Sequence, residues 1–365
     1  MKLYVKTCED LRPLLSIIVV NYNSERFFGI VRAGLESIFS IPIAKEVIIV
    51  DNGSRDKSRS HMLYILNELK CVKCSRVKLL LLDENTGFSN AINIAIKLLD
   101  KSSKYVMIVN NDCVVYNKSI PILIKVLETS KIIGCVQGKI LKWDDRTIDS
   151  AGCLVTQFGN WLKLGHGLSK TLLNFPYLIT YAHAALFVCR REAFHGFLPH
   201  FYVFGDDFEL GPRLYIYGYA SVYYPVVVGR HYGSATSVFN EDIAKLTRLW
   251  STIGTTAVIR IANLNGIWVV WGLIKIIIEL LASVLQRDKQ KTYGLVRGLI
   301  VGLSIKMERY KLLRSSKGKS IKVPMLKIKL RDIPLLLVKG RRRTIYSKYV
   351  PNYIRAHALK LMAGS

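Results

Sequence analysis

The chain is 365 residues long, enough for one large domain with an appendage or for two domains. Half of its residues are hydrophobic and only 22% are charged, which excludes a wholly disordered protein. The formal net charge is +27, and +18 of it lies in the last 80 residues, where 21 Lys and Arg face 3 Asp and Glu. This asymmetry predicts an anionic partner: membrane lipid, nucleic acid or a phosphorylated substrate.

The seven cysteines are scattered along the chain. Cys71 and Cys74 form one Cys-x-x-Cys pair, but no second pair follows at the spacing of a structural zinc site. We therefore interpret the cysteines as ordinary thiols in a reducing compartment. The first twelve residues are mixed and polar, unlike a signal peptide, so the active domain is expected to face the cytoplasm.

The first 115 residues alternate apolar, β-rich runs with helical patterns. Ser24 and Ser119 are predicted to cap two of the helices with their side chains. The alternation indicates a doubly wound α/β sheet. The predicted elements are strands at 14–21, 45–50, 77–82 and 105–109, and helices at 24–39, at 57–69, from about 90 to 100 and from 119 onward.

Short polar segments mark the ends of the first, second and fourth predicted strands, at 21–23, 51–54 and 110–112. In an open α/β sheet, ligands bind beyond the carboxyl ends of the strands. Each of these polar segments alone is explained equally well as an ordinary turn, because Asn and Asp are favoured in turns. The chain has no Gly-x-Gly-x-x-Gly after its first strand and no Gly-Lys-Ser/Thr loop, which disfavours a dinucleotide-binding dehydrogenase and a P-loop nucleotidase.

Residues 133–185 have an irregular pattern, and strands are predicted again at 184–188 and 222–228, with a helical turn from 190. Between these strands, Asp206, Asp207 and Glu209 place three carboxylates within four residues, framed by aromatics. Pro212 argues against a helix that runs past its first turn there. A solvated acidic turn is the alternative interpretation, but like charges and aromatic surroundings raise a carboxylate's pKa, and such groups cluster at functional sites.

These motifs resemble, in order and in spacing, those of family-2 glycosyltransferases with the GT-A fold, in particular the rhamnosyltransferase-like branch. The resemblance covers residues 14 to about 240. It implies an α/β fold of GT-A type, a doubly wound mixed sheet with a Rossmann-like nucleotide-binding half. The matching segments are 17–23, 50–54, 85–90, 110–112 and 205–210, together with His231.

The resemblance also implies roles for individual residues. Asp207 would be the catalytic base, with Asp206 and Glu209 on the acceptor side. Asp112 and His231 would hold Mg²⁺ or Mn²⁺. Two positions depart from the family pattern: the metal motif has Asn110 where a second carboxylate is usual, and Asp206 replaces the usual Glu. The residues implied for the donor nucleotide are Asn21, Tyr22, Asn23, Asp51, Asn85, Gly87, Asn110 and Asn111, with Asp51 expected to read the base.

The chemistry of glycosyl transfer also fits these residue types, independently of the resemblance. Glycosyl transfer from a sugar nucleotide expels a diphosphate, and a hard cation on its oxygens stabilises that leaving group. Mg²⁺ and Mn²⁺ prefer oxygen ligands and take only one or two protein carboxylates, so Asp112 can supply one. Direct inversion then needs a single general base beside the acceptor hydroxyl, and a carboxylate with a raised pKa can serve.

Residues 266–285 are mostly apolar and long enough to span a bilayer. A polar stripe at helical spacing, which includes Lys275 and Glu279, instead favours a helix that lies in the membrane interface or packs on a partner. The apolar run at 294–305 is too short to span, and a transmembrane hairpin remains the alternative. Beyond Met307 the chain is basic, most densely at 341–343, which favours anionic membrane lipid over nucleic acid because no recognition motif accompanies the charge.

We therefore expect three parts: a GT-A catalytic domain at 1–240, a helical, interfacial membrane-associated region at 241–310 and a basic tail at 311–365. The expected function is an inverting, metal-dependent glycosyltransferase at the cytoplasmic face of the cell membrane. It would move a sugar from a nucleotide-sugar donor to a hydroxyl of a lipid-linked or growing glycan acceptor. The alternatives are a polyprenyl-phosphate glycosyltransferase, whose phosphate acceptor needs no base, and a non-catalytic membrane scaffold that kept the fold.

Overall fold

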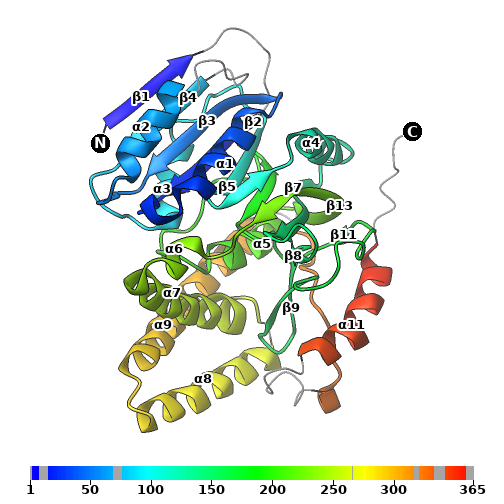
Figure 1. The fold of residues 1–365 in the computed structure, drawn as a ribbon. Helices are drawn as coiled ribbons and strands as arrows, with labels where there is room; N and C mark the ends of the chain where they lie inside the picture. Colours follow the sequence, from blue (N-terminus) through cyan, green and yellow to red (C-terminus); the bar gives the residue numbers. More distant parts are fainter. Residues whose placement is uncertain are drawn as a thin grey trace.

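The structure is a computed structural model that describes residues 2–7, 15–68, 76–264, 266–315, 320–332 and 342–358. The predicted Cys71–Cys74 pair and the side chains of the basic cluster at 341–343 lie outside the described residues. Figure 1 shows a mixed α/β body above and a group of helices below it, with α8 at the lower end and α11 along one side.

The strands alternate with helices through the first half of the chain, as the sequence predicts. They are β1 (Lys2–Thr7), β2 (Leu15–Asn21), β3 (Ala44–Asp51), β4 (Arg76–Leu81), β5 (Tyr105–Asn110), β6 (Cys113–Val115), β7 (Ile133–Lys142), β8 (Ile148–Ser150), β9 (Cys153–Val155), β10 (Trp161–Lys163), β11 (Tyr177–Leu178), β12 (Leu186–Arg190) and β13 (Ala220–His231).

The helices fall into two groups, those that flank the sheet and those that follow it in the chain. The first group is α1 (Phe28–Phe39), α2 (Ser58–Glu68), α3 (Phe88–Ile96), α4 (Ile120–Glu128) and α5 (Asp206–Ile216), with short 3₁₀ turns η1 (Glu25–Phe27) and η2 (Asn117–Ser119). The second group is α6 (Ala235–Val238), α7 (Glu241–Gly254), the π-helical η3 (Thr255–Ala262), α8 (Ile267–Leu285), α9 (Lys289–Ser315), η4 (Leu330–Asp332) and α11 (Arg342–His357).

The main sheet has the strand order β1-β4-β3-β2-β5-β12-β7-β13-β11. Strands β4, β3, β2 and β5 run parallel, whereas β12 pairs antiparallel with β5 and with β7. The parallel part has the predicted doubly wound arrangement, and the rest makes the sheet mixed. Because parallel strands end at one edge, the tips of β2, β3 and β5 are brought together there.

Both faces of the sheet are covered, which is why its strands are almost continuously apolar. Ile17 on β2 faces a core shared with α1, α2 and α4, while its neighbour Ile18 faces a second core shared with α3 and α5. Consecutive side chains of a strand point to opposite faces, so one strand contributes to both cores.

The structure corrects several local predictions. Ser24 and Ser119 make no side-chain cap; their hydroxyls donate to Ser58 Oγ and to the Val227 carbonyl instead. The segment after Arg190 is a turn and not helical. Strand β7 lies in the stretch predicted to be irregular. Its glycines are required by packing, since a Cβ on Gly138 would lie 2.1 Å from a Val228 methyl carbon.

Helix α5 contradicts the prediction that Pro212 would end it. Proline in a helix interior costs about 3 kcal/mol because it removes one hydrogen bond and crowds the preceding turn. All residues of α5 are buried, and the chain continues as a helix from Asp206 to Ile216. The apolar area that α5 buries outweighs the local cost, since one fully buried Leu or Phe contributes about 1.5–3 kcal/mol.

Residues on the two sides of the predicted boundary at 240 pack against each other, and the boundary itself stays a prediction. Ala257 and Val258 of η3 are fully buried against Phe208 of α5. Part of the predicted tail also packs on the strands: the Leu326 amide donates to the Val155 carbonyl of β9, which pairs with β10 in a separate small sheet, and the Tyr353 hydroxyl of α11 donates to the Leu178 carbonyl of β11 in the main sheet. The catalytic half therefore shares its core with later segments.

Candidate active site

Three predicted donor residues form one buried hydrogen-bonded chain at the tips of β2, β3 and β5. Asn111 Nδ2 donates to Asn21 Oδ1 at 2.9 Å, and Asn21 Nδ2 donates to Asp51 Oδ2 at 3.3 Å. Asn21 and Asp51 are fully buried. The Asn21 amide acts as donor and acceptor at once, so the network fixes its orientation. Asn110 is the last residue of β5 and is half-buried beside this chain.

Arg59 of α2 completes the surroundings of Asp51, a contact that the sequence did not indicate. Its Nε donates to Asp51 Oδ1 at 2.9 Å, and its Nη2 donates to the Leu82 carbonyl. The Ser54 amide also donates to Asp51 Oδ1, at 3.1 Å. These groups shield Asp51 from solvent, and its predicted contact with the nucleobase of the donor stays a prediction.

The two loops that carry Asn23 and Asn85 are held by their own side chains. Asn23 has a left-handed backbone (φ 43°), and its Oδ1 accepts from the Arg55 amide at 2.9 Å. Asn85 Oδ1 accepts from Asn52 Nδ2 at 2.9 Å and from the Gly87 amide at 3.0 Å. These predicted donor residues thus shape loops around the strand tips, and the half-buried Tyr22 lies between Asn21 and Asn23 in sequence.

Gly87 occupies a position that only glycine fits. Its φ is +84°, and a Cβ there would lie 2.5 Å from the Tyr202 carbonyl oxygen. That carbonyl accepts from the Phe88 amide at 2.6 Å, and the Tyr202 hydroxyl donates to the Asn85 carbonyl at 3.1 Å. Tyr202 therefore joins this loop to the segment that leads into α5.

Asp112 and His231 meet at the tips of β5 and β13, as the resemblance implies. His231 Nε2 lies 3.1 Å from Asp112 Oδ1, and both side chains are buried. Asp112 Oδ2 accepts from the Ala235 amide at 3.2 Å. Although burial opposes it, the two nearby carboxylates of Asp112 and Asp149 raise the pKa of His231 to about 9. Without a cation, the pair is therefore an ion pair.

Asp149 of β8 holds the other side of the His231 ring. His231 Nδ1 donates to Asp149 Oδ2 at 2.9 Å. Lys163 Nζ lies 2.7 Å from Asp149 Oδ1, and His166 Nδ1 lies 3.3 Å from the same oxygen. Burial alone would raise the pKa of Asp149, but these three partners hold it well below its usual range. Sequence reasoning missed Asp149 because it stands 82 residues from His231.

The residues present fit a divalent cation. His231 Nε2 is buried and has no hydrogen-bond partner among the described residues, although it lies 3.1 Å from Asp112 Oδ1. Asp112, Cys113 and His231 offer ligand atoms within 4.8 Å of one another. The Cys113 thiol donates to the Ala185 carbonyl, and burial raises its pKa well above its usual range, so it is a poor ligand for a hard cation. Asp112 and His231 would hold the ion, with a diphosphate and water completing its oxygen shell.

Asp206 and Asp207 begin α5, and a glycine sets their position. Gly205 has a φ of +100°, and a Cβ there would lie 2.7 Å from the Phe201 ring. Asp207 Oδ1 accepts from the Phe208 amide at 2.8 Å, and its Oδ2 accepts from the Ala184 amide at 3.4 Å. Asp207 therefore points toward the segment before β12.

Burial raises the pKa of both aspartates. Asp206 is 3% exposed and Asp207 is 7% exposed, and the negative charge of Asp206 raises the pKa of Asp207 further. Among the described residues, neither carboxylate forms an ion pair with Lys, Arg or His. An unpaired carboxylate of raised basicity is the kind of group that accepts a proton from a hydroxyl.

Glu209 has different surroundings from its two neighbours. It is fully buried, and it accepts from Arg213 Nε at 2.9 and 3.1 Å. Arg309 of α9 lies 3.5 Å from the same carboxylate and donates to the Glu209 carbonyl at 3.1 Å. The structure thus places this carboxylate in an ion pair that ties α5 to α9, and its predicted role on the acceptor side stays a prediction.

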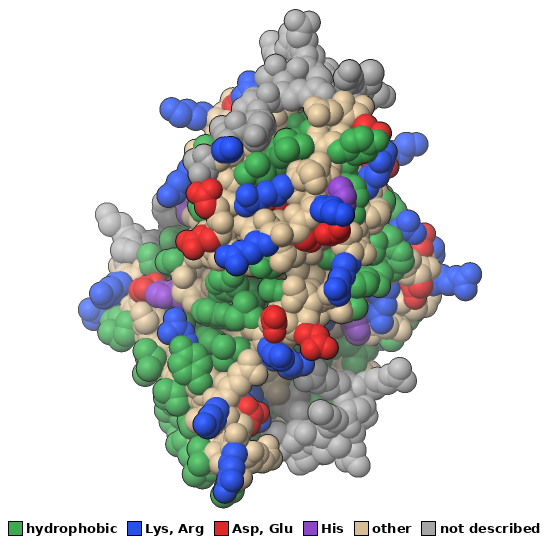
Figure 2. Space-filling view, turned by 60° about the vertical axis from the view of Figure 1, so that its left-hand side comes forward, with side chains coloured by type: hydrophobic (Ala, Val, Ile, Leu, Met, Phe, Trp, Pro, Cys, Tyr) green, Lys and Arg blue, Asp and Glu red, His purple; other side chains and the backbone are tan. Residues whose placement is uncertain are grey.

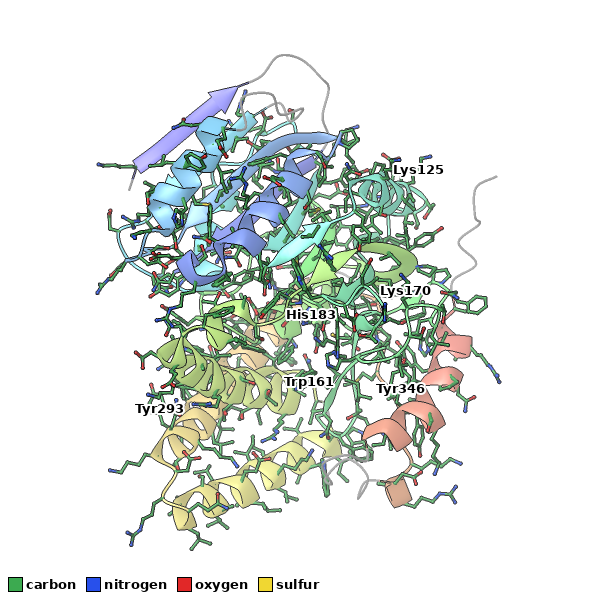
Figure 3. All side chains as sticks on the ribbon, viewed as in Figure 1. Lys125, Trp161, Lys170, His183, Tyr293 and Tyr346 are labelled. Atoms are coloured by element: carbon green, nitrogen blue, oxygen red, sulfur yellow. The ribbon has the colours of Figure 1, made fainter. Side chains whose placement is uncertain are left out.

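Residues 183–185 connect the carboxylate of Asp207 with the Asp112 motif. The Ala184 amide binds Asp207, while the Ala185 carbonyl accepts from the Asn110 amide at 2.9 Å. His183 begins this segment, and its ring centre lies 6.1 Å from that of His231. Figure 3 labels His183 near the centre of the molecule, between the sheet and the lower helices. The candidate base and the candidate metal ligands therefore border one site.

His183 is a further side chain of this site that the motifs did not indicate. Its Nδ1 accepts from the Ala185 amide at 3.4 Å, which places the ring proton on Nε2. Burial lowers the pKa of His183 to about 3, so the ring is neutral near pH 7. A neutral imidazole with an Nε2–H group can donate one hydrogen bond to an oxygen in the site.

A curled mixed sheet of this order, with its polar motifs at one edge, is consistent with the GT-A fold of nucleotide-sugar glycosyltransferases. Residues 16–197 match the sequence model of glycosyl transferase family 2. The chain therefore carries a glycosyl transferase family 2 domain. The rhamnosyltransferase-like branch stays a prediction, and no curated protein matches the sequence.

Several solved structures are similar to this chain at low identity. The mannosyltransferase PcManGT from Pyrobaculum calidifontis, in complex with GDP-Man and Mn²⁺, matches over 95% of this chain and 86% of its own, with 16% identity and a TM-score of 0.49. S. aureus TarS 1–349 in complex with UDP-GlcNAc matches over 84% and 92%, with 14% identity and a TM-score of 0.46. GalNAc-T7 with UDP, GalNAc and Mn²⁺ matches over 67% and 50%, with 14% identity and a TM-score of 0.45.

Proposed function

We propose that the protein is an inverting, metal-dependent glycosyltransferase. It moves a sugar from a nucleotide-sugar donor to a hydroxyl of a lipid-linked or growing glycan at the cytoplasmic face of the cell membrane. The observation that carries the proposal is the arrangement around residues 183–185, where the carboxylate of Asp207 and the Asp112–His231 pair border one site. Residues 16–197, which include Asp112 and this segment, match the family 2 model.

Each side of this site has a separate task in the proposed reaction. Asp112 and His231 would hold a cation, which would supply positive charge to stabilise a diphosphate leaving group. Asp207 accepts the proton of the acceptor hydroxyl, and its raised pKa makes it a stronger base than an exposed aspartate. A hydroxyl acceptor fits this arrangement better than a phosphate, because a phosphate is already deprotonated. One base and one displacement give inversion at the anomeric carbon.

The proposed location is supported by the charge and by the C-terminal helices. A net +18 lies in the last 80 residues, which suits anionic lipid. Among the described residues, α8 is the only helix long and apolar enough to cross a bilayer by length and composition. An enzyme held at a membrane meets a lipid-linked acceptor in two dimensions, which supports that class of acceptor.

Calorimetry with nucleoside diphosphates tests the donor and metal assignments together. The full chain is titrated with UDP, GDP and dTDP, with and without Mn²⁺. We expect one of them to bind, and Mn²⁺ to strengthen that binding. Asp112→Asn keeps an acceptor for the Ala235 amide but loses the charge, and should abolish the Mn²⁺ effect. Asp288→Asn, at an exposed residue, is the matched control and should bind as the wild type does.

Release of nucleoside diphosphate from the corresponding nucleotide sugar then separates an enzyme from a scaffold. Slow transfer to water is expected even without the natural acceptor. The proposal would be contradicted by a protein that binds no nucleoside diphosphate, or by one that binds it but releases none from any nucleotide sugar in the presence of Mn²⁺.

A further inference from the structure

Helices α8 and α9 each present one apolar stripe to solvent. The exposed residues recur at three or four positions, which places them on one side of each helix. On α8, Ile278 and Leu281 are 60% and 62% exposed, and on α9 Ile300 is 64% exposed. Figure 2 shows hydrophobic side chains gathered at the lower end of the molecule. The outer stripes comprise Ile267, Val270, Ile274, Ile277, Ile278, Leu281, Val284 and Leu285 on α8, and Tyr293, Val296, Ile300, Leu303, Met307, Tyr310 and Leu313 on α9.

The polar stripe of α8 faces the catalytic half and not the solvent. Lys275 Nζ donates to Asn160 Oδ1 at 2.8 Å and to the Phe158 carbonyl at 3.1 Å. Glu279 accepts from both Nη atoms of Arg260, at 2.7 and 2.9 Å. The inner face of α8 therefore binds the protein along much of its length, and this binding leaves the apolar face outward.

An exposed apolar face of this size needs a partner, because soluble monomers rarely expose large contiguous apolar patches. The charges at its border indicate which partner. Between residues 266 and 315, the exposed acids are Asp288 and the side chain of Glu308, against five exposed cations. A second copy of the chain would bring the same cations together, whereas anionic headgroups would neutralise them. The exposed cations are Arg287, Lys289, Arg297, Lys311 and Arg314.

The contacts of α8 also distinguish lying on a bilayer from crossing it. Its 19 residues are long enough to span. Crossing would remove Lys275 and Glu279 from their partners and place both charges in hydrocarbon, at about 2.5–3.5 kcal/mol each. A helix that lies flat keeps those partners and buries only its outer stripe, as interfacial amphipathic helices do.

We propose that the outer stripes of α8 and α9 insert side by side, in the plane of the membrane, into the headgroup–acyl boundary of an anionic bilayer. The inner polar stripe of α8 then acts as the anchor that fixes the catalytic half against that surface. This inference specifies which surface holds the protein at the membrane location given in the proposed function. It rests on the proposed function only for the identity of the acceptor, because membrane binding needs no enzymatic turnover.

Flotation with lipid vesicles tests the proposal on the full chain. The wild type should float with vesicles of phosphatidylcholine and phosphatidylglycerol, and less with vesicles of phosphatidylcholine alone. The double variant Ile278→Glu/Leu281→Glu puts two charges on the outer stripe of α8 and should lower the vesicle partition coefficient at least tenfold, because each lost aliphatic contact is worth about 1.5–3 kcal/mol. Ile132→Glu is the matched control, since Ile132 is 55% exposed but lies in the turn before β7, and its binding should be unchanged.

Other outcomes identify other occupants and overturn the proposal. Vesicle binding that the double variant keeps would show that the stripes are not the contact. Membrane association that survives carbonate extraction and yields only to detergent would show that α8 spans. Dimers that the double variant abolishes, without any vesicle binding, would show that the face joins two copies.

The same variant keeps this proposal separate from the proposed function. The double variant changes no residue of the candidate active site, so its calorimetric binding of nucleoside diphosphate should equal that of the wild type. Loss of flotation with intact nucleotide binding supports the membrane surface. Flotation of a wild type that binds no nucleoside diphosphate would contradict the proposed function but would still support the membrane surface.

Discussion

Asp207 and Glu209 lie two residues apart on α5, and the fold gives them opposite surroundings. Glu209 is bound by Arg213 and lies beside Arg309, so its charge is neutralised within the protein. Asp207 accepts from the backbone amides of Phe208 and Ala184, forms no ion pair with a cation among the described residues, and has the charge of Asp206 beside it. The comparison shows that burial alone does not define a functional carboxylate. The contacts with cations decide whether a buried acid holds the fold or stays available for proton transfer.

Of the substitutions that test this comparison, the one at Glu209 should cause the largest loss of stability. Glu209→Gln keeps the size of the side chain but leaves two buried guanidinium groups without their charge partner. Removing one partner of a buried ion pair typically costs about 3–5 kcal/mol of unfolding free energy. We expect a loss of that size in urea unfolding, with nucleotide binding retained by the protein that remains folded. A free energy of unfolding equal to that of the wild type would show that the pair does not hold α5 to α9.

A third buried carboxylate, Asp149, differs from both, because its partners are Lys163, His166 and the predicted metal ligand His231. Asp149→Asn can still accept from His231 Nδ1 but no longer supports the ring with a negative charge. Such outer partners of metal ligands are typically worth about 10–100-fold in metal affinity. We expect the Mn²⁺ affinity, followed by the paramagnetic resonance of free Mn²⁺, to fall within that range. Asp145→Asn, outside this cluster, should leave the affinity unchanged, and equal affinities in both variants would contradict the positioning role.

The raised pKa of Asp207 should make the wild type lose stability as the pH rises from about 4 to about 8. The pKa of Asp207 is raised in the folded state, so folding favours its protonated form and stability falls as pH rises from the unfolded value of about 4 toward the folded pKa. Asp207→Asn removes this loss, at about 1.4 kcal/mol per unit of raised pKa. We expect the variant to melt a few degrees above the wild type at pH 8, and at the same temperature at pH 4. A variant that is less stable at pH 8 would contradict the unpaired state of Asp207.

The smallest expected effect comes from the neighbouring charge. Asp206→Asn removes the like charge beside Asp207 and should lower the pKa of Asp207. Activity that depends on ionised Asp207 rises with pH through that pKa, so the acidic limb of the pH–rate profile should move to lower pH. Nucleoside diphosphate release, measured across pH for wild type and variant, checks this shift. A limb that stays in place would show that another group sets the profile.

The sequence predicted the parts of the fold that local pattern controls. Strands such as β2 and β5 are continuous apolar runs that end in Asn or Asp, so both the strand and its polar tip can be found from neighbouring residues. The same holds for the three carboxylates of α5. Strand β7 could not be found this way, because its Lys139 is buried and bonded to the Lys170 carbonyl and Asn174 Oδ1, a contact made only after folding.

The contacts that assign roles within the site are long-range, and the motifs do not contain them. Arg309 stands 100 residues from Glu209 in sequence, and nothing near either residue indicates the pair. The direction of the polar stripe on α8 was equally hidden, because periodicity shows that a helix has two faces but not which face the protein covers. Residue types therefore indicated the site, and tertiary contacts separated Asp207 from Glu209.

The central claim is that Asp207 acts on the acceptor and not on the donor. The most direct test measures nucleoside diphosphate release at saturating donor, together with donor affinity, for the wild type, Asp207→Asn and Asp206→Asn. A group that works only in the transition state lowers kcat without changing ground-state binding. General bases contribute about 10²–10⁴-fold, so Asp207→Asn should lose at least a hundredfold in kcat, more than Asp206→Asn, with donor affinity unchanged. A loss of donor affinity in Asp207→Asn, or a larger loss of kcat in Asp206→Asn, would contradict the account.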